Sequence, residues 1–189
     1  MVGLDARGNS ILAALPHDEF TRICEDLRVV NLEQGAILYE WLTVTDEILF
    51  PTSAIVSMVT LMEDGQSVES VLAGDDTISG AWVACGVQRA PWRVVVQSAG
   101  RALAMDASVF AERLNASPVL RQLVLRSAVA AHFLTSQSVG CTRFHDLTSR
   151  AARWLLMVVD RTHSTDIHLT QEFLSQMLGA HRPSVTVAL

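Results

Sequence analysis

The feature that most constrains the fold is a change in hydrophobic period near Asp106. From Val29 to that point, short apolar or β-branched runs alternate with turn residues, whereas later apolar residues recur at helical spacing. Many short strands at regular intervals are typical of an antiparallel sandwich or barrel. We therefore predict an α+β fold in which an N-terminal antiparallel β-roll is followed by helices. The expected strands are Val29–Leu32, Ala36–Tyr39, Ile48–Phe50, Ile55–Leu61, Val68–Leu72, Val94–Gln97 and Ala102–Met105.

Three further signals lie before and within the predicted roll. Residues 10–26 have helical spacing, with Ser10 as a candidate N-cap. Asp64-Gly65 predicts a hairpin, because a type I′ turn requires positive φ. Residues 77–92 are too irregular for a strand, and an insertion at this place in a β-roll is where a small ligand would be held.

A long helix is predicted after the roll. Ser117-Pro118 has the form of a cap residue followed by proline in the first helical turn, and the helix is expected to run to about Cys141. Two apolar stripes suit a helix that packs on its own domain and on a partner helix, which predicts a homodimer. The alternative is a single core helix with one broad apolar face. The expected dimer stripe is Leu123, Ser127, Ala130, Leu134 and Gln137.

The last twenty residues form the most informative segment. Thr170 can cap a short helix, Gly179 can make a tight turn, and Pro183 lies in the first turn of a second helix. Two short helices joined in this way predict a helix-turn-helix, whose second helix enters the major groove of DNA. The alternative is an ordinary helix pair with a solvated Arg182. The expected DNA-contacting residues are Thr170, Gln171, His181, Arg182, Ser184 and Thr186.

Composition restricts the remaining function classes. The net charge of −6 does not favour nucleic acid, although residues 147–189 carry four arginines against three acids, and the local footprint is what counts. No apolar run approaches the roughly 18 residues of a membrane span, and residues 1–9 contain no leader segment. We therefore expect a cytoplasmic protein with no membrane partner.

Cysteine and histidine patterns give no indication of a metal or cofactor. The three cysteines are far apart, with no C-x-x-C pair, and the six histidines occur in no zinc motif. A phosphate-binding P-loop, a G-x-S-x-G nucleophile and a dinucleotide fingerprint are likewise missing from the sequence. We expect no metal, no cofactor and no enzymatic activity.

Four stretches together carry a resemblance to a known family. They are GAILYE (35–40), ILFPTSAIVSMVTLMEDGQSVE (48–69), CTRFHDLTSRAARWLLMVVDR (141–161) and LTQEFLSQMLGAHRPSVT (169–186). In these stretches, and in their order and spacing, the chain resembles the Crp/Fnr family of transcription regulators over nearly its whole length. The resemblance implies a cyclic-nucleotide-binding-like β-roll, a homodimer, a palindromic double-stranded DNA operator, and an effector signal passed through the long helix.

The resemblance also suggests how the chain is divided. We expect a sensor domain with flanking helices over 1–116, a dimerisation helix and hinge over 117–145, and a winged helix-turn-helix domain over 146–189. The sequence ends at Leu189, about two turns into the second helix of the pair. We therefore expect that last domain to be incomplete, without its wing.

Two departures from the family concern the ligand. Cyclic-nucleotide-binding members carry a Gly-Glu pair and an arginine with a small neighbour, whereas residues 78–82 here contain no acid. Without the carboxylate and a fixed arginine, the ribose contact and the charge-assisted phosphate pair are lost, so we predict no tight cyclic-nucleotide binding. Cys24 stands alone, so an iron–sulfur cluster is not expected either. The candidate residues for a pocket with an unknown small-molecule effector are Ser79, Gly80, Ala81, Arg89 and Arg93.

These observations together predict a dimeric, sequence-specific DNA-binding transcription regulator. An effector at the β-roll, other than a cyclic nucleotide, would gate it. The alternative is a β-roll module that binds a small molecule or a protein and does not bind DNA.

Overall fold

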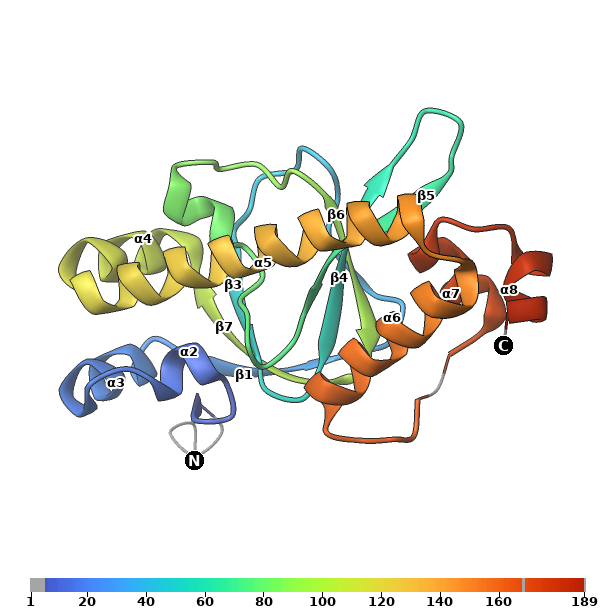
Figure 1. Ribbon diagram of the computed structural model, residues 1–189. Helices are drawn as coiled ribbons and strands as arrows, with labels where there is room; N and C mark the ends of the chain where they lie inside the picture. Colours follow the sequence, from blue (N-terminus) through green and yellow to red (C-terminus); the bar gives the residue numbers. More distant parts are fainter. Residues whose placement is uncertain (1–5, 168, 189) are drawn as a thin grey trace.

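A computed structural model describes residues 6–167 and 169–188 and confirms the predicted α+β fold (Figure 1). The prediction that residues 1–9 contain no leader segment falls largely on residues 1–5, which lie outside the described residues, as does Leu189. The strands are β1 (Arg28–Leu32), β2 (Ile37–Tyr39), β3 (Glu47–Pro51), β4 (Ile55–Leu61), β5 (Ser67–Ala73), β6 (Arg93–Ser98) and β7 (Gly100–Asp106). The helices are α2 (Ser10–Ala13), α3 (His17–Cys24), the 3-10 helix η1 (Ala81–Cys85), α4 (Ala107–Ala116), α5 (Pro118–Phe144), α6 (Leu147–Thr162), α7 (Gln171–Leu178) and α8 (Arg182–Ala188).

The strands form two antiparallel sheets, as the alternating runs predict. One sheet has the order β1-β7-β3 and the other has the order β2-β6-β4-β5. All seven predicted strands are present, and no end is shifted by more than two residues. Strand β5 is an edge of the larger sheet, since it pairs only with β4. Helices α5 and α7, which follow the roll in sequence, contact this edge strand.

Two local predictions need correction. The cap of α2 is Asn9 and not Ser10, because Asn9 is fully buried and its side-chain oxygen accepts from the Ile11 amide at 3.2 Å. The hairpin at Asp64-Gly65 forms, but its loop has three residues between the paired residues 62 and 66, and only Gly65 has positive φ. A type I′ turn needs two such residues, so the loop is a tight turn followed by a left-handed glycine.

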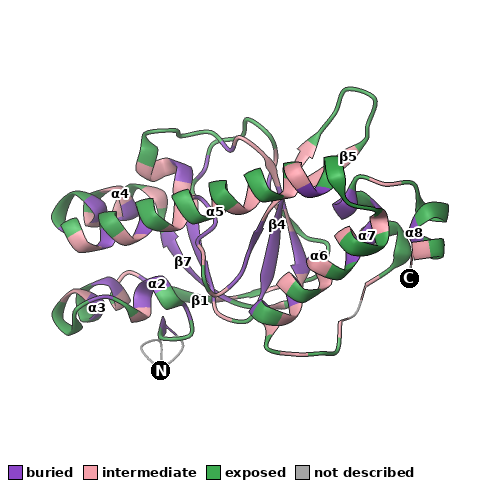
Figure 2. Cartoon of the chain, viewed as in Figure 1, coloured by how far each residue is buried: buried purple, intermediate pink, exposed green. Residues whose placement is uncertain are grey.

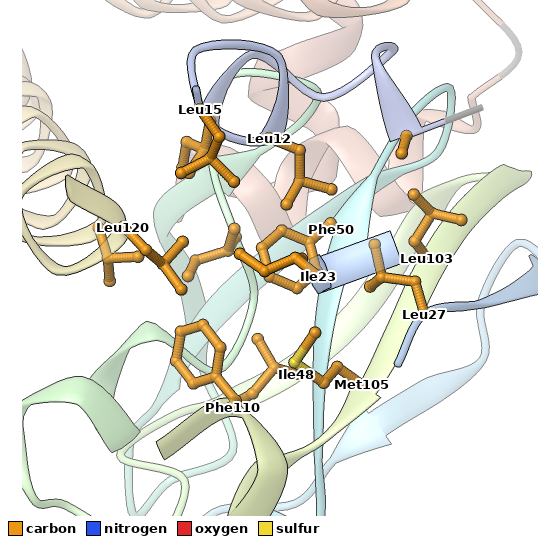
Figure 3. Packing of buried hydrophobic residues seen from close by; sticks show 14 of the residues in the cluster. Leu12, Leu15, Ile23, Leu27, Ile48, Phe50, Leu103, Met105, Phe110 and Leu120 are labelled. Carbon is orange, nitrogen blue, oxygen red and sulfur yellow. The ribbon is translucent and has the colours of Figure 1, made fainter. Parts of the chain in front are cut away.

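The core of the roll lies between the smaller sheet and the flanking helices (Figure 3). Phe50 on β3 and Phe110 on α4 meet edge-to-face, with ring centroids 6.1 Å apart. Leu120 and Val124 of α5 are also fully buried in this cluster, so the N-terminal half of the long helix is packed on its own domain. The second half lies beside β5, where the Thr135 hydroxyl donates to the Ser70 carbonyl at 2.9 Å, and it runs toward α6 and α7 (Figure 1).

Helix α5 has 27 residues, and polar side chains occur among the apolar ones along its whole length. The Ser117 hydroxyl accepts from the Leu120 amide at 2.9 Å and caps it, as the Ser117-Pro118 signal predicts. In the part of the chain that the structure describes, no helix combines the length and the apolar character needed to cross a membrane.

Candidate nucleic-acid interface

Helices α7 and α8 form the helix pair that the sequence predicts. The Thr170 hydroxyl caps α7 by accepting from the Phe173 amide at 3.1 Å. Gly179 ends the helix in the left-handed conformation, with φ 57° and ψ 48°. A side chain there would also approach Val68 of β5 to 3.1 Å, so both backbone and space favour glycine. Ala180 and His181 follow, and α8 begins at Arg182.

The interior of the pair is apolar, and its outer surface carries the predicted DNA-contacting residues. Leu174 and Val185 are fully buried between the helices and α6. The six predicted contact residues are all exposed, and the alternating burial of α7 and α8 is visible in Figure 2. Those six are Thr170, Gln171, His181, Arg182, Ser184 and Thr186.

The structure brings two of these residues into direct contact. The Thr186 hydroxyl on α8 donates to the Gln171 side-chain oxygen on α7 at 2.8 Å. Arg182 is exposed and, among the described residues, its guanidinium forms no ion pair. Its five donors are therefore available to a ligand, and a planar fork of this kind suits guanine or phosphate.

Helix α6 packs against the α7–α8 pair. The Asp146 side chain caps α6 by accepting from the Ser149 amide at 2.8 Å, and this bond holds the pKa of Asp146 below its usual range. Arg150 donates to the carbonyl of Leu178 at the end of α7. Because Trp154 packs in the same cluster as Leu174, α6, α7 and α8 share one core.

That core also includes residues of the β-roll. Ile55 and Val59 of β4 and Leu72 of β5 belong to the same apolar cluster as Trp154 and Met177. The helix-turn-helix unit is thus docked on the edge strand β5, which it covers together with α5 (Figure 1). Covering a free edge removes a site for unwanted strand pairing.

Polar contacts cross the same interface. Trp154 donates to Glu69, the Arg161 guanidinium pairs with Asp76 at 2.8 Å, and His163 meets Asp75 at 2.9 Å. Burial raises the pKa of Glu69 to about 7, although the bonds from Ser57 and Trp154 and the charge of Arg161 act in the opposite direction. No sequence pattern indicated that the Glu69 carboxylate is buried at this interface. A glutamate on a strand with alternating polar and apolar residues is normally expected to face solvent.

The predicted effector residues fall into two groups. Ser79 and Gly80 are buried, and Gly80 has φ 97° with no room for a side chain beside Ile48. The Ser79 hydroxyl is buried without a hydrogen-bond partner among the described residues. Ala81 is half-buried at the start of η1.

The two candidate arginines are engaged elsewhere. Arg89 is exposed and donates to the Leu42 carbonyl at 2.7 Å, and Arg93 forms an ion pair with Glu40 at 2.9 Å. Both partners belong to the segment between β2 and β3. The structure therefore directs both guanidinium groups to that segment.

An aromatic cluster, which no sequence pattern indicated, lies beside this segment. Trp82 lies edge-to-face against Tyr39 at 5.6 Å and against Trp92 at 6.1 Å between ring centroids. The Trp82 indole donates to the Thr45 hydroxyl at 2.8 Å. Tyr39 and Trp82 are buried in this cluster, and Trp92 is partly buried against them.

The outer face of α5 carries exposed apolar side chains at a spacing of four. They are Leu125, Val129 at 69% exposure, and Phe133 at 66% (Figure 2). In the stripe predicted from the sequence, Ala130 and Gln137 are exposed, whereas Leu123, Ser127 and Leu134 are half-buried. Leu134 lines a cavity that faces β5.

No family model and no curated protein matches the sequence, but solved structures match the fold. A protein described as a transcriptional regulator of the Crp/Fnr family from Eubacterium rectale gives a TM-score of 0.75 at 14% identity, covering 96% of this chain and 85% of its own. The c-di-GMP responsive global regulator CLP of Xanthomonas campestris gives 0.76 at 11% identity, with 92% and 90% covered. FixK2 from Bradyrhizobium japonicum gives 0.70 at 10% identity, with 86% and 82% covered.

The three matches cover 86% to 96% of this chain. At such identities the likeness is one of fold, and it confirms the resemblance inferred from the four sequence stretches. The chain has the fold of the Crp/Fnr transcription regulators.

Proposed function

We propose that this chain is a sequence-specific DNA-binding transcription regulator that acts in the cytoplasm as a homodimer on a palindromic operator. The observation that carries the proposal is the exposed start of α8, where Arg182 follows the Gly179 turn with no ion-pair partner among the described residues. In a helix-turn-helix, the side chains at this end of the second helix reach base edges. The structures of similar fold are themselves named as transcription regulators, which supports the same reading.

The dimer is proposed to form through α5. Leu125, Val129 and Phe133 leave an apolar stripe on a helix whose opposite face is buried in its own domain. Apolar residues three to four apart are what a paired helix requires. Ala130 and Gln137 of the predicted stripe border it, and we include them in the seam.

The effector is proposed to be a small molecule other than a cyclic nucleotide. Residues 78–82 offer no carboxylate to a ribose, and Arg93 is already paired with Glu40. The Trp82 cluster further reduces the space inside the roll. The buried Ser79 hydroxyl, unpartnered among the described residues, is the polar group that remains for an effector.

The direct test is Arg182→Ala, measured on an operator selected from random double-stranded DNA. A bidentate arginine–guanine pair contributes about 1–3 kcal/mol of base discrimination. We expect weaker binding and a flattened preference at one base pair of each half-site. The matched control is Arg22→Ala, which removes an exposed arginine on α3 at the opposite end of the molecule (Figure 1).

The second candidate is a β-roll module that binds a small molecule or a protein and no DNA. It is favoured by the overall charge of −6. If selection from random DNA enriches no sequence, or if Arg182→Ala changes neither affinity nor base preference, this second function replaces the first.

A further inference from the structure

Two side chains of α6 are tied to the β-roll by polar contacts. Glu69 on β5 accepts from the Trp154 indole nitrogen at 2.9 Å and from the Ser57 hydroxyl at 2.6 Å. Seven residues along α6, Arg161 makes a forked ion pair with Asp76, with Nη2–Oδ2 at 2.8 Å and Nε–Oδ1 at 3.1 Å. We call these two pairs, Glu69–Trp154 and Asp76–Arg161, the docking contacts.

The α6 side of both docking contacts is buried. Arg161 is 8% exposed, and an arginine is seldom buried to this extent unless its charge is paired. Gly74 lies so close under it that a Cβ at this position would come within 2.8 Å of the arginine Cβ. The chain therefore leaves room for the arginine stem, and its charge is satisfied by the forked pair with Asp76.

The packing beside the Glu69–Trp154 contact is incomplete. A cavity of about 70 Å³ lies between β5, α5, α6 and α7, and both Glu69 and Trp154 line it. Where the interface between the helices and β5 contains unfilled space, fewer dispersion contacts fix the position of the helices on the strand. Directional hydrogen bonds then contribute more to the angle between the two units.

The docking contacts hold α6 at two separate points. Trp154 and Arg161 are two turns apart, which is about 10 Å along the helix axis. A helix held at two such points resists both rotation about its axis and tilting against the sheet. Because Leu174 and Val185 pack in the same core as Trp154, the angle of α8 follows that of α6.

The docked arrangement leaves the start of α8 uncovered, since His181 and Arg182 are exposed. A dimer that reads a palindrome needs its two recognition helices about 34 Å apart, in successive major grooves. We propose that Glu69 and Asp76 are positioning residues for DNA recognition, which act through Trp154 and Arg161 to hold the helix-turn-helix unit at its reading angle. This inference rests on the proposed function.

The first measurement needs no DNA. Hydrogen exchange at β5 reports docking, because the helices cover this edge strand. Trp154→Phe removes one donor and keeps an aromatic ring, while Asp76→Asn removes one charge at a half-exposed side chain. We expect faster exchange at β5 in both variants, with the β1-β7-β3 sheet unchanged. The control Asp160→Asn makes the same substitution at an exposed residue of α6 and should leave exchange at β5 unaltered.

The second measurement uses the selected operator and derivatives with half-sites moved by one or two base pairs. We expect each variant to bind the selected operator about tenfold more weakly than the wild type. Its preference for the original spacing over the altered spacings should shrink at the same time. A residue with a purely structural role would lower affinity equally for every spacing.

The outcomes separate this inference from the function on which it rests. Unchanged exchange at β5, or an unchanged spacing preference in variants that bind the operator, overturns the positioning role and leaves the regulator intact. Tighter operator binding by the variants also overturns it, because docking would then inhibit. If the wild type binds no operator while the variants still exchange faster, the docking contacts stand but the role in DNA recognition fails with the proposed function.

Discussion

Two of the apolar cores of the molecule, one around Phe110 and one around Leu174, differ in how they are closed. The core around Phe50 and Phe110 is built from the smaller sheet and the helices that flank it in sequence (Figure 3). The core around Leu174 is completed by Ile55 and Leu72, which belong to the β-roll. The core around Phe50 therefore closes without the helix-turn-helix unit, whereas the core of that unit needs residues of the roll. We infer that the second unit depends on the first for its orientation and part of its stability.

The largest expected effect comes from Phe110→Ala in the first core. Phe110 is fully buried, and truncating such a ring costs about 3–5 kcal/mol through lost burial and the cavity left behind. Because both units depend on the roll, we expect urea unfolding to show one transition at lower denaturant for the whole chain. Phe144→Ala, at a side chain 81% exposed, is the control and should change little. If Phe110→Ala unfolded the roll while α6–α8 stayed folded, the inference that these helices depend on the roll would be wrong.

Leu174→Ala in the second core should cost slightly less, about 2–5 kcal/mol. Leu174 is fully buried between α7 and the roll. If the core is shared, hydrogen exchange should rise at β5 as well as in α7. Leu156→Ala, at an exposed leucine on α6, is the matched control. Faster exchange confined to α6–α8 would show that the unit closes its core without the roll.

The smallest expected effect is a pH dependence of the free energy of unfolding, caused by Glu69 at the interface between the roll and α6. Burial raises the pKa of Glu69 to about 7 from the ordinary 4.5, so the folded protein retains a proton that the unfolded chain releases. The free energy of unfolding should therefore fall as the pH rises from 4.5 to 7, by less than about 1.4 kcal/mol per pH unit for this single group. Glu69→Gln should lose this part of the pH dependence. Identical pH profiles for the two proteins would contradict it.

Much of the fold could be predicted because its signals are local. Each strand has a short β-branched run bounded by turn residues, and Ser117, Thr170 and Gly179 mark helix ends through bonds to their own neighbours. Even here, the cap of α2 was misplaced by one residue. Asn9 is preferred to Ser10 because its amide also donates to the carbonyls of Pro51 and Thr77, which are distant in sequence.

The residues of the candidate DNA surface were likewise predictable as a group. Helical periodicity places Val185 inside, and it leaves Arg182, Ser184 and Thr186 outside. Which of them read bases remains a prediction, as does the seam on α5. The sequence assigns the stripe of Leu123, Ser127 and Leu134 to the dimer, but these three residues are half-buried. The docking of α5 on the roll decides this, and it leaves Val129 and Phe133 exposed.

The sequence by itself determined the order of strands and helices, the turn at Gly179 and the position of the arginine after it, since each depends on residues within a few positions. Only the tertiary structure decided that Glu69 meets Trp154 and that Asp76 meets Arg161, because each pair is 85 residues apart in sequence. It likewise directed Arg89 and Arg93 to the segment between β2 and β3. Contacts of this kind depend on how the sheets and helices pack, and no local pattern encodes them.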